Sequence, residues 1–405
     1  MSTPPIEEGR LVYLRHAHSR ATQRIFEDSV VPLLAQLGSE CRLHQTYSLQ
    51  KRTELVSFGG ELFIVVDQAQ LEMFHLLNCL SALSDDDEEF VKAALFRPVG
   101  EALRDLRQYD AAALFLSRAL AAKPFLRLVQ DGNPYAGQMH WQHLVLIFHE
   151  AAHAVASEHE LKQALLNYSA LESSMWTNER IMRSVDTVLR ALDDDRPPIA
   201  DGGPEPIGDD LASQEAVSEA VTSLMASGGY FDELASDLFA VNMVADQLIE
   251  EAGAGIDLAM IDDQILAIYQ AFLNLRTLHH IDESCRRITL SGGAAAEPAA
   301  AVDLGAFAVL RAGFIARRIV HIFEPLLAPD QLQALNARLT SARQRQLGVV
   351  LPIANAIIDA ARALLDDPAA LEQELAEAAI ADLLRDATSL QRSETVDSFW
   401  QMLVI

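Results

Sequence analysis

The feature that most limits the fold of this chain is an apolar run over residues 141–159, which contains neither Gly nor Pro. Apolar side chains would cover nearly every side of a helix there, so we expect a buried helix. His149, Glu150 and His153 lie within it. Two histidines four positions apart share one helix face, one turn apart. Buried polar groups without partners are costly, and a shared metal ion would satisfy them.

The residue types at this spacing fit the chemistry of a zinc hydrolase. Such a site needs neutral nitrogen ligands, an open coordination position and a carboxylate base. His149 and His153 are therefore the predicted metal ligands, and Glu150 is the predicted base that takes a proton from bound water. A surface helix that merely carries two histidines and a glutamate is the alternative. The apolar setting favours the metal site.

A catalytic zinc ion needs a third protein ligand, and one candidate is His159. It lies ten positions after His149, an arrangement that resembles the metzincin metallopeptidases. That family has a Gly seven residues after the first histidine, where the chain turns back to the metal. Ala156 stands there in this chain and favours continuing the helix, which would point His159 away from the other two histidines.

The other candidate for the third ligand is Glu233. Residues 232–241 resemble the third-ligand helix of the gluzincin branch of zinc metallopeptidases, in which a Glu ligand is followed four residues later by an Asp. The resemblance implies that Glu233 binds zinc and that Asp237 hydrogen-bonds a ligand histidine. The two side chains would share one helix face. An acidic helix N-terminus, favoured by the helix dipole, is the alternative.

The two halves of this predicted site are far apart in the sequence. Residues 193–212 are acidic, rich in Pro and Gly and without periodicity, which predicts a mobile loop. Residues 160–192 and 213–226 carry helical patterns. We therefore expect a helical insertion and a loop between the two halves.

Cations stand inside two predicted helices. The apolar helix at 303–327 contains Arg311 and His321, either of which could stabilise the oxyanion of a tetrahedral intermediate. Pairing with the many acidic residues is the alternative. The helix at 261–290 also carries cations, which are Arg276, His279, His280, Arg286 and Arg287.

The fold class expected is mainly α with a small β-sheet, that is, α+β. Two β-rich runs, 54–58 and 61–66, are joined by Gly59-Gly60 and predict a hairpin. Asp67, with Gln70 three residues on, predicts a capped helix start. The zincin resemblance implies that an edge strand of this sheet could pair with an extended peptide substrate. A purely structural hairpin is the alternative.

Three regions are expected along the chain. Residues 1–125 form an N-terminal α+β region, residues 126–290 a zincin-like core with the mobile loop, and residues 300–405 a helical C-terminal region. Amphipathic helices at 330–347, 351–366 and 368–387 suggest that this last region is a bundle.

Composition limits the partners and the compartment. The chain has 405 residues and a net charge of −27, so it should repel nucleic acid and anionic membranes and favour neutral or basic partners. No pair among its 3 cysteines has metal-ligand spacing, which favours a reducing compartment. No signal peptide or membrane-spanning apolar stretch is apparent. These features predict a cytoplasmic location.

A rival motif stands near the N-terminus. Residues 11–19, with Arg15-His16-Ala17, resemble the opening of the histidine phosphatases, where Ala17 replaces a Gly. A basic turn facing solvent is the alternative, and no second catalytic His is evident. The prediction is therefore a zinc-dependent metallopeptidase that cleaves a protein or peptide substrate. The alternative is a non-catalytic helical interaction protein that keeps a zincin-like core as a scaffold.

Overall fold

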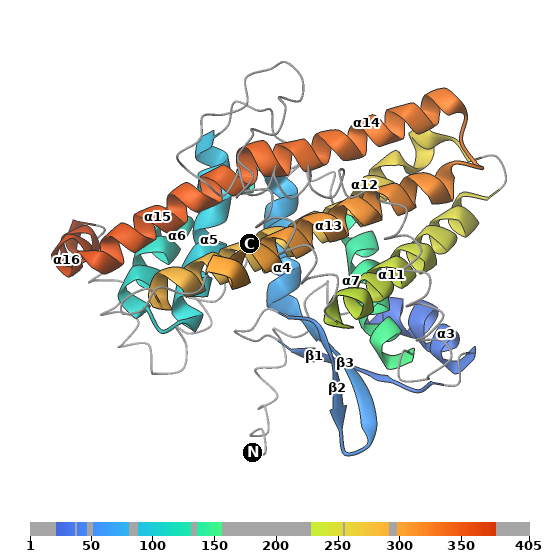
Figure 1. Cartoon of the computed structure of the whole chain (residues 1–405), viewed down its shortest axis with the longest axis horizontal. Coiled ribbons are helices and arrows are strands. Elements are labelled where there is room, and N and C mark those ends of the chain that lie inside the picture. Colours follow the sequence, from blue (N-terminus) through green and yellow to red (C-terminus); the bar gives the residue numbers. More distant parts are fainter. Residues whose placement is uncertain are drawn as a thin grey trace.

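The protein is mainly helical with one small sheet, as predicted, and this is evident in the computed structural model (Figure 1). Several predictions lie outside the described residues: the motif at 11–19, the candidate ligand His159, and the insertion and loop over 160–226. The structure describes residues 22–36, 39–46, 52–80, 88–130, 136–155, 228–253, 256–290 and 298–377.

The helices follow the apolar periodicity of the sequence, and those expected at 261–290, 303–327, 330–347 and 351–366 begin and end within five residues of the expected bounds. In chain order, they are the π-helical turn η1 (Phe26–Val30), α3 (Val31–Gln36), α4 (Gln68–Leu80), α5 (Glu88–Asp105), α6 (Tyr109–Gln130), α7 (Ala136–Val155), α11 (Gly228–Ala252), α12 (Leu258–Leu290), α13 (Pro298–Phe323), α14 (Pro329–Arg345), the π-helical turn η2 (Gln346–Val350), α15 (Leu351–Asp366) and α16 (Pro368–Glu377).

The sheet has three strands in the order β1-β3-β2. The predicted hairpin is confirmed: β2 (Glu54–Phe58) pairs antiparallel with β3 (Glu61–Asp67). Gly59 and Gly60 form its turn with φ values of 64° and 85°, a region that glycine enters without strain. The sequence did not predict β1 (Arg42–Thr46), which pairs parallel with β3. Its short, mostly polar sequence carries no alternating pattern.

The start of α4 shows one departure from expectation. Asp67 caps the helix, since its Oδ1 accepts a hydrogen bond from the Ala69 N–H at 2.9 Å. Gln70 does not complete a capping box. Its Oε1 accepts a hydrogen bond from the backbone N–H of Thr53 at 2.8 Å instead. The tertiary contact fixes the first residues of the hairpin against α4.

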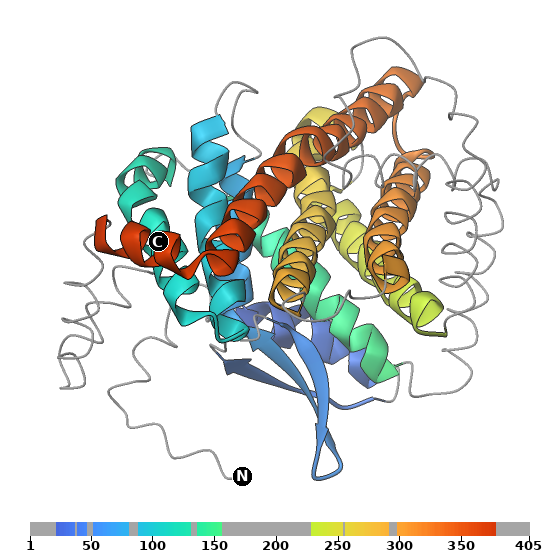
Figure 2. The ribbon, with the colours of Figure 1, turned by 60° about the vertical axis from the view of Figure 1, so that its left-hand side comes forward.

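Helix α7 lies in the middle of the fold, as its apolar sequence predicts. It packs against α11, α12 and the strands β2 and β3 (Figure 2). Leu144, Ile147 and Ala151 are fully buried. Burying one large aliphatic side chain contributes about 1.5–3 kcal/mol, so the surroundings hold α7 firmly and fix the position of its polar residues.

The helices expected at 330–347 and 351–366 are present as α14 and α15, and the structure adds how they connect. The turn η2 joins them into one continuous helix over Pro329–Asp366. By length and composition this helix could cross a membrane: an 18-residue window has a mean hydropathy of 1.6, and 33% of that window is buried. Within the fold, α15 packs against α5 and α12, and α14 packs against α12 and α13 (Figure 1).

The hydrophobic core extends over all three expected regions. Buried side chains of α5, α7, α12 and α15 belong to one cluster. This cluster is what holds the sheet and the long helices at fixed positions around α7. The division into regions at 125 and 290 stays a prediction.

Candidate metal centre

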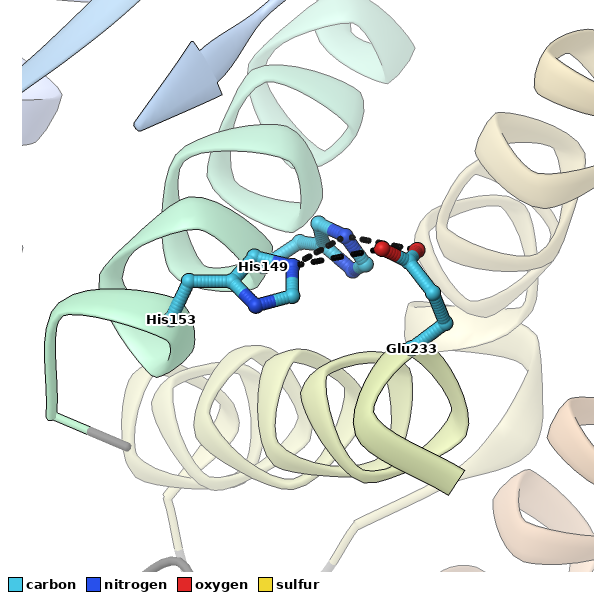
Figure 3. Close-up of side chains that lie close together, drawn as sticks. All are labelled: His149, His153 and Glu233. Carbon is cyan, nitrogen blue, oxygen red and sulfur yellow. Dashed lines mark hydrogen bonds and ion pairs between the residues drawn. The ribbon is translucent and has the colours of Figure 1, made fainter. Parts of the chain in front are cut away.

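Helices α7 and α11 bring three predicted ligands together. His149 and His153 project from α7 toward Glu233 on α11 (Figure 3). The Nε2 atoms of the two histidines lie 3.3 Å apart. Glu233 places Oε2 at 3.5 Å from the first Nε2 and Oε1 at 3.7 Å from the second. One donor atom from each residue lies within 4.8 Å of the other two, so the three can hold one metal ion.

The spacing of these donors suits a small tetrahedral ion. A tetrahedral zinc ion with bonds of about 2.0–2.1 Å keeps its ligand atoms roughly 3.3 Å apart. The separations of 3.3 Å, 3.5 Å and 3.7 Å fall close to that value. The side chain of His149 is 11% exposed and that of Glu233 is 38% exposed. The cluster is therefore enclosed around His149 and open to solvent at Glu233, as a site with a vacant coordination position requires.

A second set of residues orients the two imidazole rings. Asp237 Oδ1 lies 2.9 Å from Nδ1 of His149, although the contact is not aligned as a full hydrogen bond. Ser236 Oγ lies 3.3 Å from Nδ1 of His153. Both rings therefore meet α11 through Nδ1 and direct Nε2 toward Glu233. Metal-binding histidines characteristically have such a partner on their other nitrogen.

The sequence did not identify Ser236. It stands three positions after Glu233, on the same face of α11, and that spacing was the available signal. Its hydroxyl also bonds the backbone carbonyl of Asp232 at 3.0 Å, so its position is set by its own helix.

Arg311 of α13 contacts the site by binding the carboxylates of Asp237 and Glu233. Its Nε and Nη2 donate to the two oxygens of Asp237 at 2.5 Å and 2.7 Å. Its Nη1 lies 3.3 Å from Oε2 of Glu233. Asp237 is fully buried, and a bidentate guanidinium contact is the arrangement that best offsets the desolvation of such a charge. The other oxyanion candidate, His321, is 65% exposed and lies beside Glu324, away from the site.

Glu150 lies next to the cluster and is held by the sheet. Its Oε2 accepts a hydrogen bond from the backbone N–H of Leu55, in β2, at 2.7 Å. Burial raises the pKa of Glu150 to about 7, against the opposing effects of His149 and the Leu55 N–H. A carboxylate with a pKa near neutrality is suited to take up and release a proton.

The charges within the cluster are strongly coupled. Burial by itself would lower the pKa of His149, but the carboxylates of Asp237 and Glu233 outweigh it and raise the pKa to about 10. Burial would raise the pKa of Glu233, but His149 and Arg311 lower it to about 2. Two ionised carboxylates thus face the histidines. Arg311 and a proton on His149 balance their charge, and a metal ion would take the place of that proton.

The site opens into a large cleft of about 1110 Å³. Its walls come from the start of β2, the end of α5, one face of α12 and the metal-site residues. Cys41 and Cys285 form no disulfide among the described residues, and neither lines this cleft. The cleft is much larger than the metal site and gives it an approach from solvent.

Comparison of the chain with models of known protein families, with curated proteins and with solved structures finds no match.

Proposed function

We propose that the protein is a zinc-dependent hydrolase and that its reaction is peptide-bond hydrolysis. The observation that carries the proposal is the convergence of His149, His153 and Glu233 at tetrahedral spacing beside Glu150. Two imidazole nitrogens and one carboxylate are a ligand set found in catalytic zinc sites. The resemblance of both sequence segments to gluzincin metallopeptidases agrees with this geometry.

The bound metal would supply Lewis acidity toward the scissile carbonyl and would acidify a water molecule. Glu150 would accept a proton from that water and later donate it to the leaving amine. Its pKa of about 7 makes both steps accessible near neutral pH. The Leu55 N–H would hold the carboxylate in place while it works.

Arg311 was expected to be an oxyanion donor, but its contacts favour a positioning role. Nε, Nη1 and Nη2 are all engaged with Asp237 and Glu233. We therefore propose that Arg311 holds Asp237 in its ionised form, and that Asp237 in turn orients His149.

A peptide is the proposed substrate because of the shape of the cleft and its edge strand. β2 lies at one edge of the sheet, and the Leu55 N–H on its outer side points at Glu150 rather than at β3. Residues 53–55 line the cleft. An extended peptide could align with this edge and present one of its bonds to the metal site.

Metal analysis of the purified protein tests the ligand set. We expect about one zinc ion per chain, largely lost in His149→Ala and in Glu233→Ala. His140→Ala is a matched control, since His140 is an exposed histidine on the same helix. Metal content that is negligible, or equal in all four proteins, would contradict the site. Iron in place of zinc would contradict the proposed chemistry.

Glu150→Gln tests the base. The variant should retain its metal and lose cleavage of a mixed peptide library by a factor of about 10² or more. Cleavage at the wild-type rate would remove Glu150 from the reaction. Undetectable cleavage by the wild-type protein with its metal bound would favour the scaffold alternative.

A further inference from the structure

The balance of charged residues in the cleft, outside the metal site, differs from that of the chain as a whole. The chain has 58 acidic residues and 31 basic ones. Among the described residues that line the cleft outside the metal site, however, arginines outnumber carboxylates. The arginines are Arg52, Arg104, Arg107, Arg276 and Arg286, and the carboxylates are Glu54, Asp105 and Asp282. An excess of guanidinium groups in so acidic a protein indicates a surface that receives anions.

Helix α12 contributes the most informative part of this lining. Arg276, His279 and Arg286 recur at helical spacing on the face that borders the cleft. Arg286 is exposed. Among the residues that the structure describes, its side chain has no ion-pair partner. Arg52, two residues before β2, lines the same cleft and acts electrostatically on His279 of α12, so segments far apart in the sequence both supply guanidinium groups to it.

Arg276 is the least expected of these residues. It is 4% exposed, and its Nη1 has no hydrogen-bond partner. Within the described ranges, no carboxylate forms an ion pair with it. Burial lowers the pKa of Arg276 to about 10, which shows how strongly the site disfavours an uncompensated cation. A buried charge of this kind is stabilised when a ligand supplies the opposite charge.

The lowered pKa of His279 also reflects the positive charge of the arginines around the cleft. Burial lowers the pKa of this histidine, and Arg311 and Arg52 lower it further. His279 is thereby kept neutral and does not add to the charge. The arginines alone provide the attraction for an anion.

We propose that the arginine-lined cleft selects substrates with acidic side chains close to the bond that is cut. Glutamate or aspartate carboxylates would pair with Arg276 and Arg286 from α12 and with Arg52 from the β2 wall. This inference rests on the proposed function, since it names the substrate class of the same site. Guanidinium groups bind carboxylates through paired hydrogen bonds, which gives such a cleft selectivity as well as attraction.

The overall negative charge does not prevent this recognition. At physiological ionic strength, exposed charges separated by more than about 8 Å are largely screened. The distant carboxylates of the chain therefore act weakly on a peptide inside the cleft. Arginines in contact with the peptide are screened much less, and the local charge determines the preference.

A binding measurement tests the inference without requiring turnover. The zinc-loaded Glu150→Gln protein is titrated into a fluorescent glutamate-rich peptide, and separately into the same peptide with every glutamate replaced by glutamine. We expect the acidic peptide to bind at least about tenfold more tightly. Equal affinity for the two peptides would overturn the proposal.

Two cleft variants locate the preference. Arg276→Met and Arg286→Gln, each added to Glu150→Gln, should reduce the preference several-fold, whereas the control Arg362→Gln should not. Arg362 is an exposed arginine of α15 outside the cleft, 3.3 Å from Asp359. A preference that survives both cleft substitutions would show that the carboxylates bind the metal or another surface, and it would overturn the proposal.

Thermal unfolding distinguishes ligand binding from a structural role for Arg276. Because the free protein gives this cation no counterion among its described residues, Arg276→Met should unfold at the same or a higher temperature than the wild type. A clearly lower unfolding temperature would assign Arg276 to the fold and overturn its role in recognition. Because Arg286 is exposed, Arg286→Gln should leave the fold unchanged. Its effect on peptide binding therefore does not depend on folding.

Cleavage of a mixed peptide library by the wild-type protein separates the two proposals. Products that are enriched in acidic residues near the cleaved bond support both the hydrolase and the acidic preference. Cleavage without that enrichment overturns the acidic preference and leaves the hydrolase intact. Selective binding of the acidic peptide with no cleavage at all overturns the hydrolase and leaves the anion-binding cleft.

Discussion

The backbone N–H of Leu55 donates a hydrogen bond to the carboxylate of Glu150, with 2.7 Å between nitrogen and oxygen. The donor belongs to the edge strand β2 and the acceptor to the central helix α7. This bond joins the sheet to the proposed base and determines where the carboxylate lies in the cleft. The sequence of β2 or of α7 alone does not predict this hydrogen bond, because each sequence specifies only its own strand or helix.

Leu55→Pro should lower peptide cleavage by about tenfold or more while the metal content stays unchanged. The substitution removes the N–H that holds Glu150, and a hydrogen bond to a charged group contributes about 1.5–3 kcal/mol. Because this N–H points away from β3, no bond of the β2–β3 ladder is lost, and an edge strand tolerates proline at such a position. Cleavage rates and metal content measured on the same sample check the prediction.

The control for that experiment is Val56→Pro. The next N–H along an antiparallel strand points to the other side, and Val56 is paired with Phe63. Its replacement should cost a ladder bond and reduce stability more than Leu55→Pro does. Equal cleavage by Leu55→Pro and wild type would mean that Glu150 needs no support from the strand.

Asp237→Asn should destabilise the protein by about 3–5 kcal/mol and weaken zinc binding by about 10- to 100-fold. Asp237 is fully buried between Arg311 and His149, so its loss leaves Arg311 without its bidentate partner. Denaturant unfolding and a zinc competition assay measure the two effects. Asp246→Asn, an exposed residue of the same helix, should change stability by less than about 0.5 kcal/mol.

The combination of Asp237→Asn with Arg311→Met should be less destabilising than the sum of the two single changes. Residues in one charge network couple by about 0.5–3 kcal/mol, and removing both charges leaves neither unpaired. Additive losses would show that the two side chains stabilise the fold independently.

The stability of the fold should fall as the pH drops below about 6.5, partly because of His280. Its Nε2 lies 2.6 Å from Oδ1 of Asn355, which links α12 to α15. Burial lowers the pKa of His280 from its ordinary value of 6.5, against the Asn355 carbonyl, and Arg276 and Arg287 lower it further. The unfolded chain therefore takes up this proton at a higher pH than the folded one, so acid favours unfolding.

His280→Gln removes this titration and retains a donor for Asn355. The variant should lose less stability than the wild type between pH 7 and pH 5, as measured by denaturant unfolding at each pH. Parallel losses in the two proteins would show that His280 does not contribute to the acid sensitivity.

Gly100→Ala should destabilise the protein by about 1–3 kcal/mol. A methyl group at this position of α5 would lie 2.9 Å from Cγ of Leu116 and 3.0 Å from its backbone nitrogen, so α6 would have to shift. Gly348→Ala is the matched control, because no atom lies within 4 Å of its added methyl group. That change should stabilise the helix by about 0.5–1 kcal/mol. Thermal unfolding should show a lower unfolding temperature for Gly100→Ala and a higher one for Gly348→Ala than for the wild type.

The net charge of the chain suggested neutral or basic partners, whereas the cleft suggests acidic ones. The total of −27 counts every carboxylate equally. Arg52 and Arg286 stand far apart in the sequence and line the same cleft only after folding. Because charge acts over short distances in salt solution, the residues in contact with a ligand matter more than the total.

The sequence by itself determined the local elements: the buried helix with His149 and His153 on one face, the hairpin around Gly59-Gly60, and the long apolar helices. These follow from side-chain periodicity and turn chemistry, which depend on neighbouring residues. The sequence named Glu233 as a candidate ligand only through a resemblance, and the tertiary structure decided that it meets those histidines and that Leu55 holds Glu150. Such contacts depend on how apolar faces pack against one another across long stretches of chain, and no local pattern records that choice.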